Sequence, residues 1–137
     1  MNSQPILYRP ELPSDAEAVA GEVAAAFDGP GEARLVEALR RTGALAVSLV
    51  ALAGDEVVGH VALSPVAVDG RTGGGRWQGL APLTVLPAHQ GRGIGRTLVE
   101  TAVAAAARDG VVAVFVLGSS RYYGRLGFEA AAPLGWR

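Results

Sequence analysis

The sequence predicts a mixed α/β domain built around one β-sheet, and three observations support this fold class. The length of 137 residues corresponds to one domain. Half of the residues are apolar and only 18% are charged, which is enough apolar surface for a buried core. Strand-like and helix-like segments follow one another in the order β-α-α-β-β-β-α-β-α-β. We therefore expect a single domain over residues 1–137.

Two helices are expected in the N-terminal third. Ser14 and Glu17 have the spacing of a capping box, which predicts a helix that begins there and continues to about residue 27. A second helix is predicted over residues 32–41, with Gly43 as its C-terminal stop.

The remaining elements follow from apolar runs and glycine punctuation. The Gly54-Asp55 pair between two β-branched runs predicts a hairpin. Residues 111–117 are almost entirely apolar, which is typical of a strand buried on both faces. Residues 69–76 hold four glycines and predict a mobile loop. Strands are expected at 6–9, 45–53, 57–68, 80–86, 111–117 and after Gly127, and further helices at 97–108 and 121–126.

The composition excludes several kinds of chemistry. The net charge of −1 gives no basic excess for nucleic acid or an anionic membrane. All 12 basic residues are arginine, so a Schiff-base lysine and a standard Walker A loop are excluded. The absence of cysteine excludes thiol nucleophiles and thiolate metal sites, and two histidines are too few for a metal cluster. We therefore expect no metal. No targeting signal or membrane span is apparent, so we expect a cytoplasmic protein.

A glycine-rich turn connects a predicted strand to a predicted helix. It has the sequence Gln90-Gly91-Arg92-Gly93-Ile94-Gly95 and follows a strand that ends at Pro87. Glycines let backbone N–H groups converge on a ligand, and a helix N-terminus attracts negative charge. Arg92 and Arg96 add full positive charges, so phosphate or pyrophosphate is the expected occupant.

Two known phosphate loops fit this turn poorly. The dinucleotide pattern fails because position 96 is arginine, and the Walker A pattern lacks its first glycine and its lysine. A nucleotide-binding domain that uses residues 90–97 remains an alternative, as does a turn that needs glycine only for packing.

A second motif lies about thirty residues downstream. The strand Val114-Phe115-Val116-Leu117-Gly118 precedes Tyr122-Tyr123-Gly124-Arg125-Leu126-Gly127-Phe128. Together with the turn at 90–95, this order resembles the GNAT superfamily of N-acetyltransferases. The resemblance implies a mixed, mostly antiparallel sheet flanked by helices and acetyl-CoA as co-substrate. The residues after Phe128 are fewer than the usual last strand of that family needs. We expect either a naturally short chain, a truncated one, or a neighbouring subunit that completes the sheet, and the open edge favours a homodimer.

The resemblance also implies the binding residues. The backbone of Leu83, Thr84 and Val85 would pair with the pantetheine arm, and one of their N–H groups would polarise the acetyl carbonyl. Tyr123 would protonate the leaving thiolate, although its ring could instead only pack on the cofactor. Tyr122 is expected to be a packing neighbour. The expected cofactor residues are Leu83, Thr84, Val85, Gln90, Gly91, Arg92, Gly93, Ile94, Gly95, Arg96 and, at a position where relatives often have a polar residue, Ser119.

The general base stays open at this point. Glu32, His60 and an ordered water are the candidates, and a lone histidine on a strand is more often a core residue. Glu22 and Glu37 are expected on solvated helix faces.

The sequence thus predicts an acetyl-CoA-dependent N-acetyltransferase that acts by direct transfer in a ternary complex. The acceptor would be a primary amine of an unidentified small molecule or peptide. The alternative is a non-catalytic module of the same fold that binds acetyl-CoA or CoA as a sensor.

Overall fold

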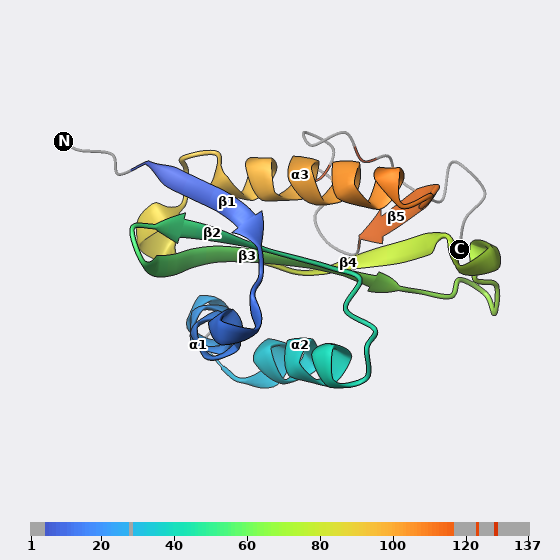
Figure 1. Ribbon diagram of the computed structural model, residues 1–137, viewed down its shortest axis with the longest axis horizontal. Coiled ribbons are helices and arrows are strands. Elements are labelled where there is room, and N and C mark those ends of the chain that lie inside the picture. The colour runs from blue at the N-terminus through green and yellow to red at the C-terminus, as the bar shows by residue number, and fades with distance from the viewer. Residues whose placement is uncertain (1–4, 28, 117–122, 124–127, 129–137) are drawn as a thin grey trace.

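The computed structural model describes residues 5–27, 29–116, 123 and 128. Within them lie five strands, three α-helices and three short 3-10 turns (Figure 1). The strands are β1 (Ile6–Pro10), β2 (Val47–Ala53), β3 (Glu56–Pro65), β4 (Trp77–Val85) and β5 (Ala113–Val116). The helices are α1 (Ala16–Phe27), α2 (Gly31–Arg41) and α3 (Ile94–Arg108), and the turns are η1 (Pro13–Asp15), η2 (Gly73–Gly75) and η3 (Pro87–His89).

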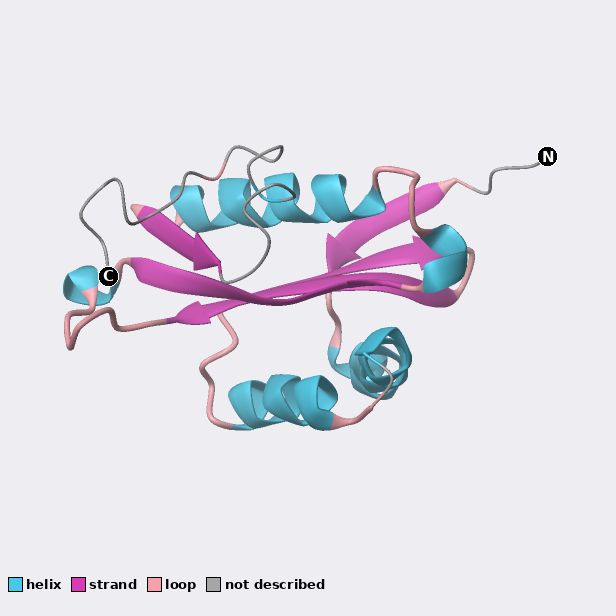
Figure 2. Cartoon of the chain, turned by 180° about the vertical axis from the view of Figure 1, so that it is seen from behind, coloured by secondary structure: helices cyan, strands magenta, loops and turns pink. Residues whose placement is uncertain are grey.

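One five-stranded sheet separates two helical layers. Its order is β1-β2-β3-β4-β5, antiparallel between the first four strands and parallel between β4 and β5. Helix α3 covers one face, and α1 and α2 cover the other (Figures 1 and 2). Each face has its own apolar core, with Val61 and Leu98 on the α3 side and Val19 and Val50 on the other. The predicted mixed α/β class and the order of these eight elements are confirmed.

The predicted turns agree with the backbone. Gly54 joins β2 to β3 with φ +62°, and Gly43 follows α2 with φ +76°. Both conformations favour glycine, because a Cβ is strained in the left-handed region. The predicted hairpin and the predicted stop of the second helix are therefore confirmed.

The start of the first helix differs from the prediction. Ser14 lies inside the turn η1 rather than at an N-cap position. The Asp15 carboxylate instead accepts a hydrogen bond of 2.7 Å from the backbone N–H of Leu12 and pairs with Arg9 at 2.6 Å. The capping carboxylate is thus Asp15, because the 3-10 turn shifts the register of the first residues.

Several other boundaries and one burial also differ from the prediction. Strand β4 begins at Trp77, not Leu80, because Gln78–Leu80 pair with β3 and Trp77–Leu80 also pair with the non-local strand β5. Helix α3 begins at Ile94, not Thr97. The four residues of β5 are half-buried rather than buried, because in the described part of the chain β5 lies at the edge of the sheet. Part of the loop expected at 69–76 forms the turn η2.

Strands β4 and β5 share only part of their length. β5 pairs with Trp77–Leu80, whereas residues 83–85 of β4 pair with β3 alone among the residues that the structure describes. The second half of β4 therefore has one edge without a described strand neighbour. The predicted helix at 121–126 and the final strand lie largely outside the described residues.

A glycine in β3 brings α3 close to the sheet. A Cβ built on Gly59 would lie 3.1 Å from Leu98 Cδ1, 3.3 Å from Ile94 Cγ2 and 3.2 Å from the carbonyl oxygen of Thr84. These contacts are tighter than usual, so the first turns of α3 rest where a larger residue would push them outward.

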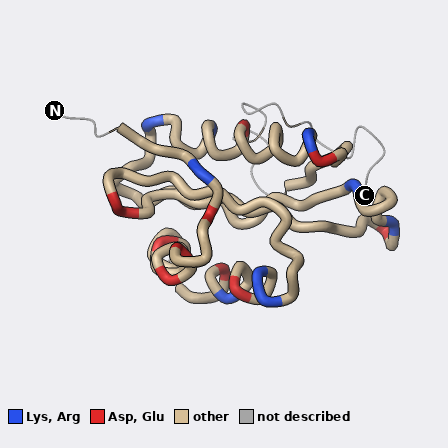
Figure 3. Tube along the Cα trace, in the orientation of Figure 1, with Lys and Arg blue, Asp and Glu red and all other residues tan. Residues whose placement is uncertain are grey.

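Charged residues lie mainly on the helices, the turns and β1, away from the middle of the sheet (Figure 3). None of the helices in the described part is both long and apolar enough to cross a membrane.

Candidate active site

A pocket of about 500 Å³ opens where β4 ends and the turn before α3 begins. This volume is in the range of small-molecule sites. The lining residues come from β4, from the turn and from the first residues of α3, together with Tyr123. They are Leu83, Val85, His89, Gln90, Gly91, Gly93, Ile94, Gly95, Arg96 and Tyr123.

The glycines of the turn leave space on the ligand side. Gly91 and Gly93 have φ angles of +79° and +80°, and Gly93 is the N-cap of α3. A Cβ built on either residue would meet no protein atom within 4 Å. The glycines therefore serve the backbone conformation and leave open the volume that a bound anion requires at a helix N-terminus.

The strand β4 presents its backbone polar groups alternately to its two edges. Leu86 N–H donates to the carbonyl oxygen of Val58 at 2.8 Å, and in an antiparallel ladder every second residue makes such bonds. Thr84, opposite His60, therefore directs its N–H and C=O toward β3. Leu83 and Val85 direct theirs toward the edge without a described strand neighbour. Of the three residues predicted to bind a ligand through their backbone, only Leu83 and Val85 have backbone groups that face this edge.

Gln90 holds the turn on the strand. Its side-chain Nε2 donates a hydrogen bond of 3.0 Å to the carbonyl oxygen of Val85. One outward carbonyl of the β4 edge is therefore already used within the protein. The role of Gln90 in the structure is to fix the turn against β4.

The other predicted residues are placed as follows. Tyr123 lines the pocket, and its ring packs edge-on against Phe128 with a centroid distance of 5.7 Å. Arg96 lines the pocket and lies 3.6 Å from Glu100, whereas Arg92 does not line it. Ser119 and Tyr122 lie outside the described residues. His89, which was not among the predicted residues, also lines the pocket; its position two residues after Pro87, beside the glycine turn, was the available signal.

The opposite face of the same strand carries a buried carboxyl group. Because side chains alternate along a strand, Thr84 points away from the pocket that Leu83 and Val85 line. Its Oγ1 donates a hydrogen bond of 2.7 Å to Oε1 of Glu22 on α1. Glu22 is 4% exposed and Thr84 is 3% exposed. Burial raises the pKa of Glu22 to about 7, although the hydrogen bond from Thr84 lowers it.

The prediction that Glu22 lies on a solvated helix face is therefore wrong. It follows Val19 by three residues and precedes Val23, and both valines are fully buried. Helical geometry places positions three or four apart on one face, so Glu22 lies on the buried face of α1. The same spacing was visible in the sequence and was the signal that could have found it.

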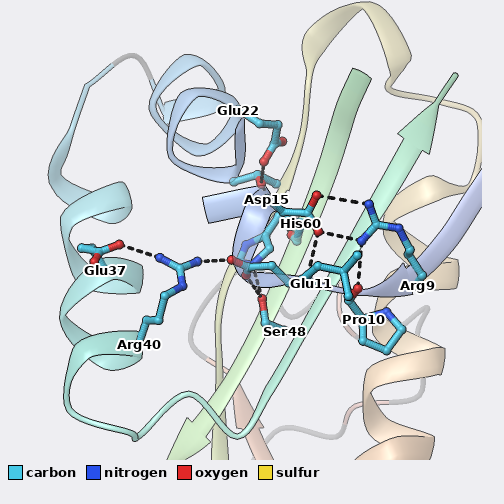
Figure 4. Close-up of polar contacts among 11 residues, drawn as sticks. Arg9, Pro10, Glu11, Asp15, Glu22, Glu37, Arg40, Ser48 and His60 are labelled. Atoms are coloured by element: carbon cyan, nitrogen blue, oxygen red, sulfur yellow. Dashed lines mark hydrogen bonds and ion pairs between the residues drawn. The ribbon is translucent and has the colours of Figure 1, made fainter. Parts of the chain in front are cut away.

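His60 belongs to a separate polar network on that side of the sheet. Its Nε2 lies 2.8 Å from Ser48 Oγ and 3.6 Å from Glu11 Oε1, and Glu11 also pairs with Arg40 (Figure 4). Burial would raise the pKa of Glu11, but His60, Ser48 and Arg40 together lower it. His60 is fully buried. This arrangement supports its reading as a core residue.

The remaining carboxylates on α2 are solvent-accessible. Glu32 is half-buried. The side chain of Glu37 is 54% exposed and pairs with Arg40 at 2.6 Å. The expectation of a solvated position for Glu37 is confirmed.

Comparisons with known proteins identify the family of this chain. A family model described as "Acetyltransferase (GNAT) domain" matches residues 44–130. The uncharacterized N-acetyltransferase YhbS of Escherichia coli is 39% identical over 128 residues, which cover 93% of this chain and 75% of YhbS. A second relative, the uncharacterized N-acetyltransferase YjhQ of Escherichia coli, is 36% identical over 121 residues, 87% of this chain and 67% of YjhQ.

Two solved structures are also similar. A GNAT family acetyltransferase from Brucella melitensis, crystallised with acetyl-CoA, has a TM-score of 0.87 and 38% identity and covers 93% of this chain and 85% of its own. YhbS from Escherichia coli in complex with CoA has a TM-score of 0.89 and 37% identity, with 97% and 73% covered. The strand edge, the glycine turn and these matches lead to one conclusion: the chain belongs to the GNAT family of acetyltransferases.

Proposed function

We propose that this chain transfers the acetyl group of acetyl-CoA directly to a primary amine of a small molecule or peptide. The observation that carries the proposal is a single pocket that joins the outward edge of β4, the glycine turn and Tyr123. The complexes of the two similar structures with acetyl-CoA and CoA support the identity of the donor. Acetyl-CoA supplies an activated acyl group in the form of a thioester.

The turn would hold the pyrophosphate of the donor. The N–H groups of Gly91 to Arg96 lie at the N-terminus of α3, where the helix dipole favours negative charge. The open Cβ directions at Gly91 and Gly93 fit a group that approaches the backbone closely. Arg96, half exposed beside the pocket, would add a charge-assisted contact.

The edge of β4 would hold the pantetheine arm. Leu83 offers an outward N–H and C=O, and Val85 offers an outward N–H, which is the pattern that an added strand recognises. One of these N–H groups would donate to the acetyl carbonyl as negative charge develops on its oxygen.

Tyr123 would act as the general acid. It lines the same pocket, and a phenol with a pKa near 10 can protonate a thiolate of roughly similar basicity. Because the chain contains no cysteine, a cysteinyl acyl-enzyme cannot form, and direct attack by the amine is the simpler route.

A paired glycine experiment tests the cofactor site. Calorimetry with acetyl-CoA should show binding, with ATP and NAD as negative controls. Gly93→Ala should lose that binding, because the added methyl enters the space left for the phosphate and strains a φ of +80°. Gly110→Ala is the matched control, since Gly110 follows the other end of α3 with φ +86° and an equally open Cβ direction.

The comparison separates strain from binding. Both variants should lose similar stability, and only Gly93→Ala should lose acetyl-CoA. Equal binding by the two variants, or ATP binding in place of acetyl-CoA, would contradict the proposed donor site.

Tyr123→Phe tests the transfer step. Removal of the phenol should lower turnover about 100-fold while the dissociation constant of acetyl-CoA stays unchanged. A variant that keeps the full rate would assign the acid to another group.

A further inference from the structure

The Glu22 carboxyl group has one oxygen whose partner is missing from the described structure. Oε1 accepts the hydrogen bond from Thr84, but Oε2 is buried and has no hydrogen-bond partner among the residues that the structure describes. Buried polar atoms are nearly always paired, since an unpaired one destabilises the fold. Such an atom marks a place where a further hydrogen-bond donor, such as one on a ligand, would be accommodated.

This oxygen lies beside the strand that would hold the donor thioester. Thr84 is the residue between Leu83 and Val85, and it contacts Glu22 at 2.7 Å. The carboxyl group and the pocket therefore lie on opposite sides of one short segment of β4. The outward edge of that segment is left unpaired by the described strands, and no described strand separates the two sides along that edge.

The other ionisable groups on this side of the sheet contact residues other than Glu22. His60 on β3 directs Nε2 toward Ser48 and Glu11, while its buried Nδ1 has no hydrogen-bond partner among the described residues, and Asp15 in η1 is paired with Arg9 (Figure 4). Glu11 itself contacts Arg40 and Ser48. Among the described residues, no cation contacts Glu22, which leaves its carboxylate to attract one from a ligand.

The proposed reaction requires such a group. A primary amine is mostly an ammonium ion at neutral pH and must lose a proton before its nitrogen can attack a thioester. An ammonium group also offers the hydrogen-bond donors that Oε2 lacks.

We propose that Glu22 is the catalytic base of this enzyme: it binds the ammonium group of the acceptor through Oε2 and takes one of its protons. This inference rests on the proposed acetyl transfer. An N–H bond of the ammonium breaks as an O–H bond forms on Glu22. The freed nitrogen then forms the C–N bond as the C–S bond breaks. Tyr123 gives its proton to the sulfur and recovers one from the nitrogen, and Glu22 returns its proton to solvent.

Glu22→Gln tests this assignment in the intact protein. The amide has the shape of the carboxyl group and can still accept the hydrogen bond from Thr84, but it takes no proton. With benzylamine, cadaverine and a tripeptide amide as acceptors, kcat/KM should fall at least about 100-fold. The affinity for acetyl-CoA should stay unchanged, and Glu22→Asp should recover part of the rate. Glu17→Gln, an exposed glutamate on the same helix, is the matched control.

The pH profile adds a readout that a purely structural role would not move. The wild-type profile of kcat/KM should rise with a midpoint near 7, the pKa of Glu22, and this limb should be absent from the residual activity of Glu22→Gln. A Glu22→Gln enzyme with the wild-type rate and the same limb would overturn the inference while the acetyltransferase activity stands.

A direct titration covers the case in which none of these amines is acetylated. The Glu22 carboxyl carbon can be followed by ¹³C NMR in the CoA complex, with Glu22→Gln for assignment. An excess of benzylamine should lower its midpoint, because a bound ammonium favours the carboxylate. A midpoint that benzylamine leaves unmoved overturns the inference. A chain that does not bind acetyl-CoA refutes the proposed function instead.

Discussion

Two buried glutamates on the same face of the sheet differ in their partners. The side chain of Glu11 is 5% exposed and contacts Arg40, Ser48 and His60. Glu22 is 4% exposed and, among the described residues, accepts a hydrogen bond from one neutral donor, Thr84. The pKa of Glu11 is lowered despite its burial, whereas burial raises the pKa of Glu22 to about 7.

The comparison shows that the surroundings, and not burial alone, decide what a carboxyl group can do. A charged partner and two polar neighbours keep Glu11 ionised, so it connects the segment after β1 to α2 and β2. With the Thr84 hydroxyl as its partner among the described residues, Glu22 can change its protonation state near neutral pH. A group of the second kind is suited to proton transfer, and one of the first kind is suited to holding elements together.

The largest expected effect is a loss of stability as the pH rises from about 5 through 7. Between the ordinary pKa of 4.5 and about 7, folded Glu22 holds a proton that the unfolded chain has released. Its contribution is therefore complete below pH 4.5 and is lost as the pH rises through 7. At 1.36 kcal/mol per pKa unit, the free energy of unfolding should fall by about 3 kcal/mol between pH 5 and pH 8.

Urea unfolding at these two pH values measures this loss. Glu22→Gln should abolish it and Glu17→Gln should keep it. Glu11 and Asp15, whose pKa values are lowered, act in another window, because their contribution is lost only as the pH falls below their ordinary range. An equal loss in Glu22→Gln would show that the two carboxyl groups do not differ as described.

A change to the partner of Glu11 should have the next largest effect. Arg40→Leu leaves the Glu11 carboxylate without its cation and should cost about 2 kcal/mol of unfolding free energy at pH 7. The neighbouring Arg41 is exposed, so Arg41→Leu is the control and should change stability by less than about 0.5 kcal/mol. Equal effects of the two substitutions would mean that the Glu11 network contributes nothing specific.

The smallest expected effect follows from a change to Thr84, the described hydrogen-bond partner of Glu22. Thr84→Val keeps the shape of the side chain but removes the hydroxyl group that lowers the pKa of Glu22. The midpoint of the neutral limb should move to higher pH, and stability at pH 8 should fall by about 1 kcal/mol. Thr101→Val on the exposed face of α3 is the control. A midpoint that stays in place would remove Thr84 from the account of Glu22.

Local features of the fold could be predicted from the sequence. Gly43 and the Gly54-Asp55 pair mark turns that depend on a few neighbouring residues, and the structure has those turns. The start of β4 at Trp77 depends on pairing with β5, more than thirty residues later in the chain. No local pattern encodes that pairing, so the boundary could not be predicted.

The site shows the same division. The turn at 90–96 was predicted because its glycines and its place before a helix are local. The contact between Glu22 and Thr84 spans 62 residues and depends on how α1 packs on the sheet. Leu83 and Val85 direct their backbone polar groups to the outward edge, whereas Thr84 directs its own toward β3. This difference depends on the register between β3 and β4, which cannot be read from the sequence.

Gly59 would give the core a role in the proposed binding of the donor. Because Ile94 and Leu98 rest directly over this residue, the missing methyl group determines how near the first amides of α3 come to the end of β4. The distance between the two halves of the ligand site is thus set by a residue absent from the lining of the pocket. Selection or engineering could therefore tune how tightly the enzyme holds its donor through an interior position, while every group that surrounds the ligand keeps its identity.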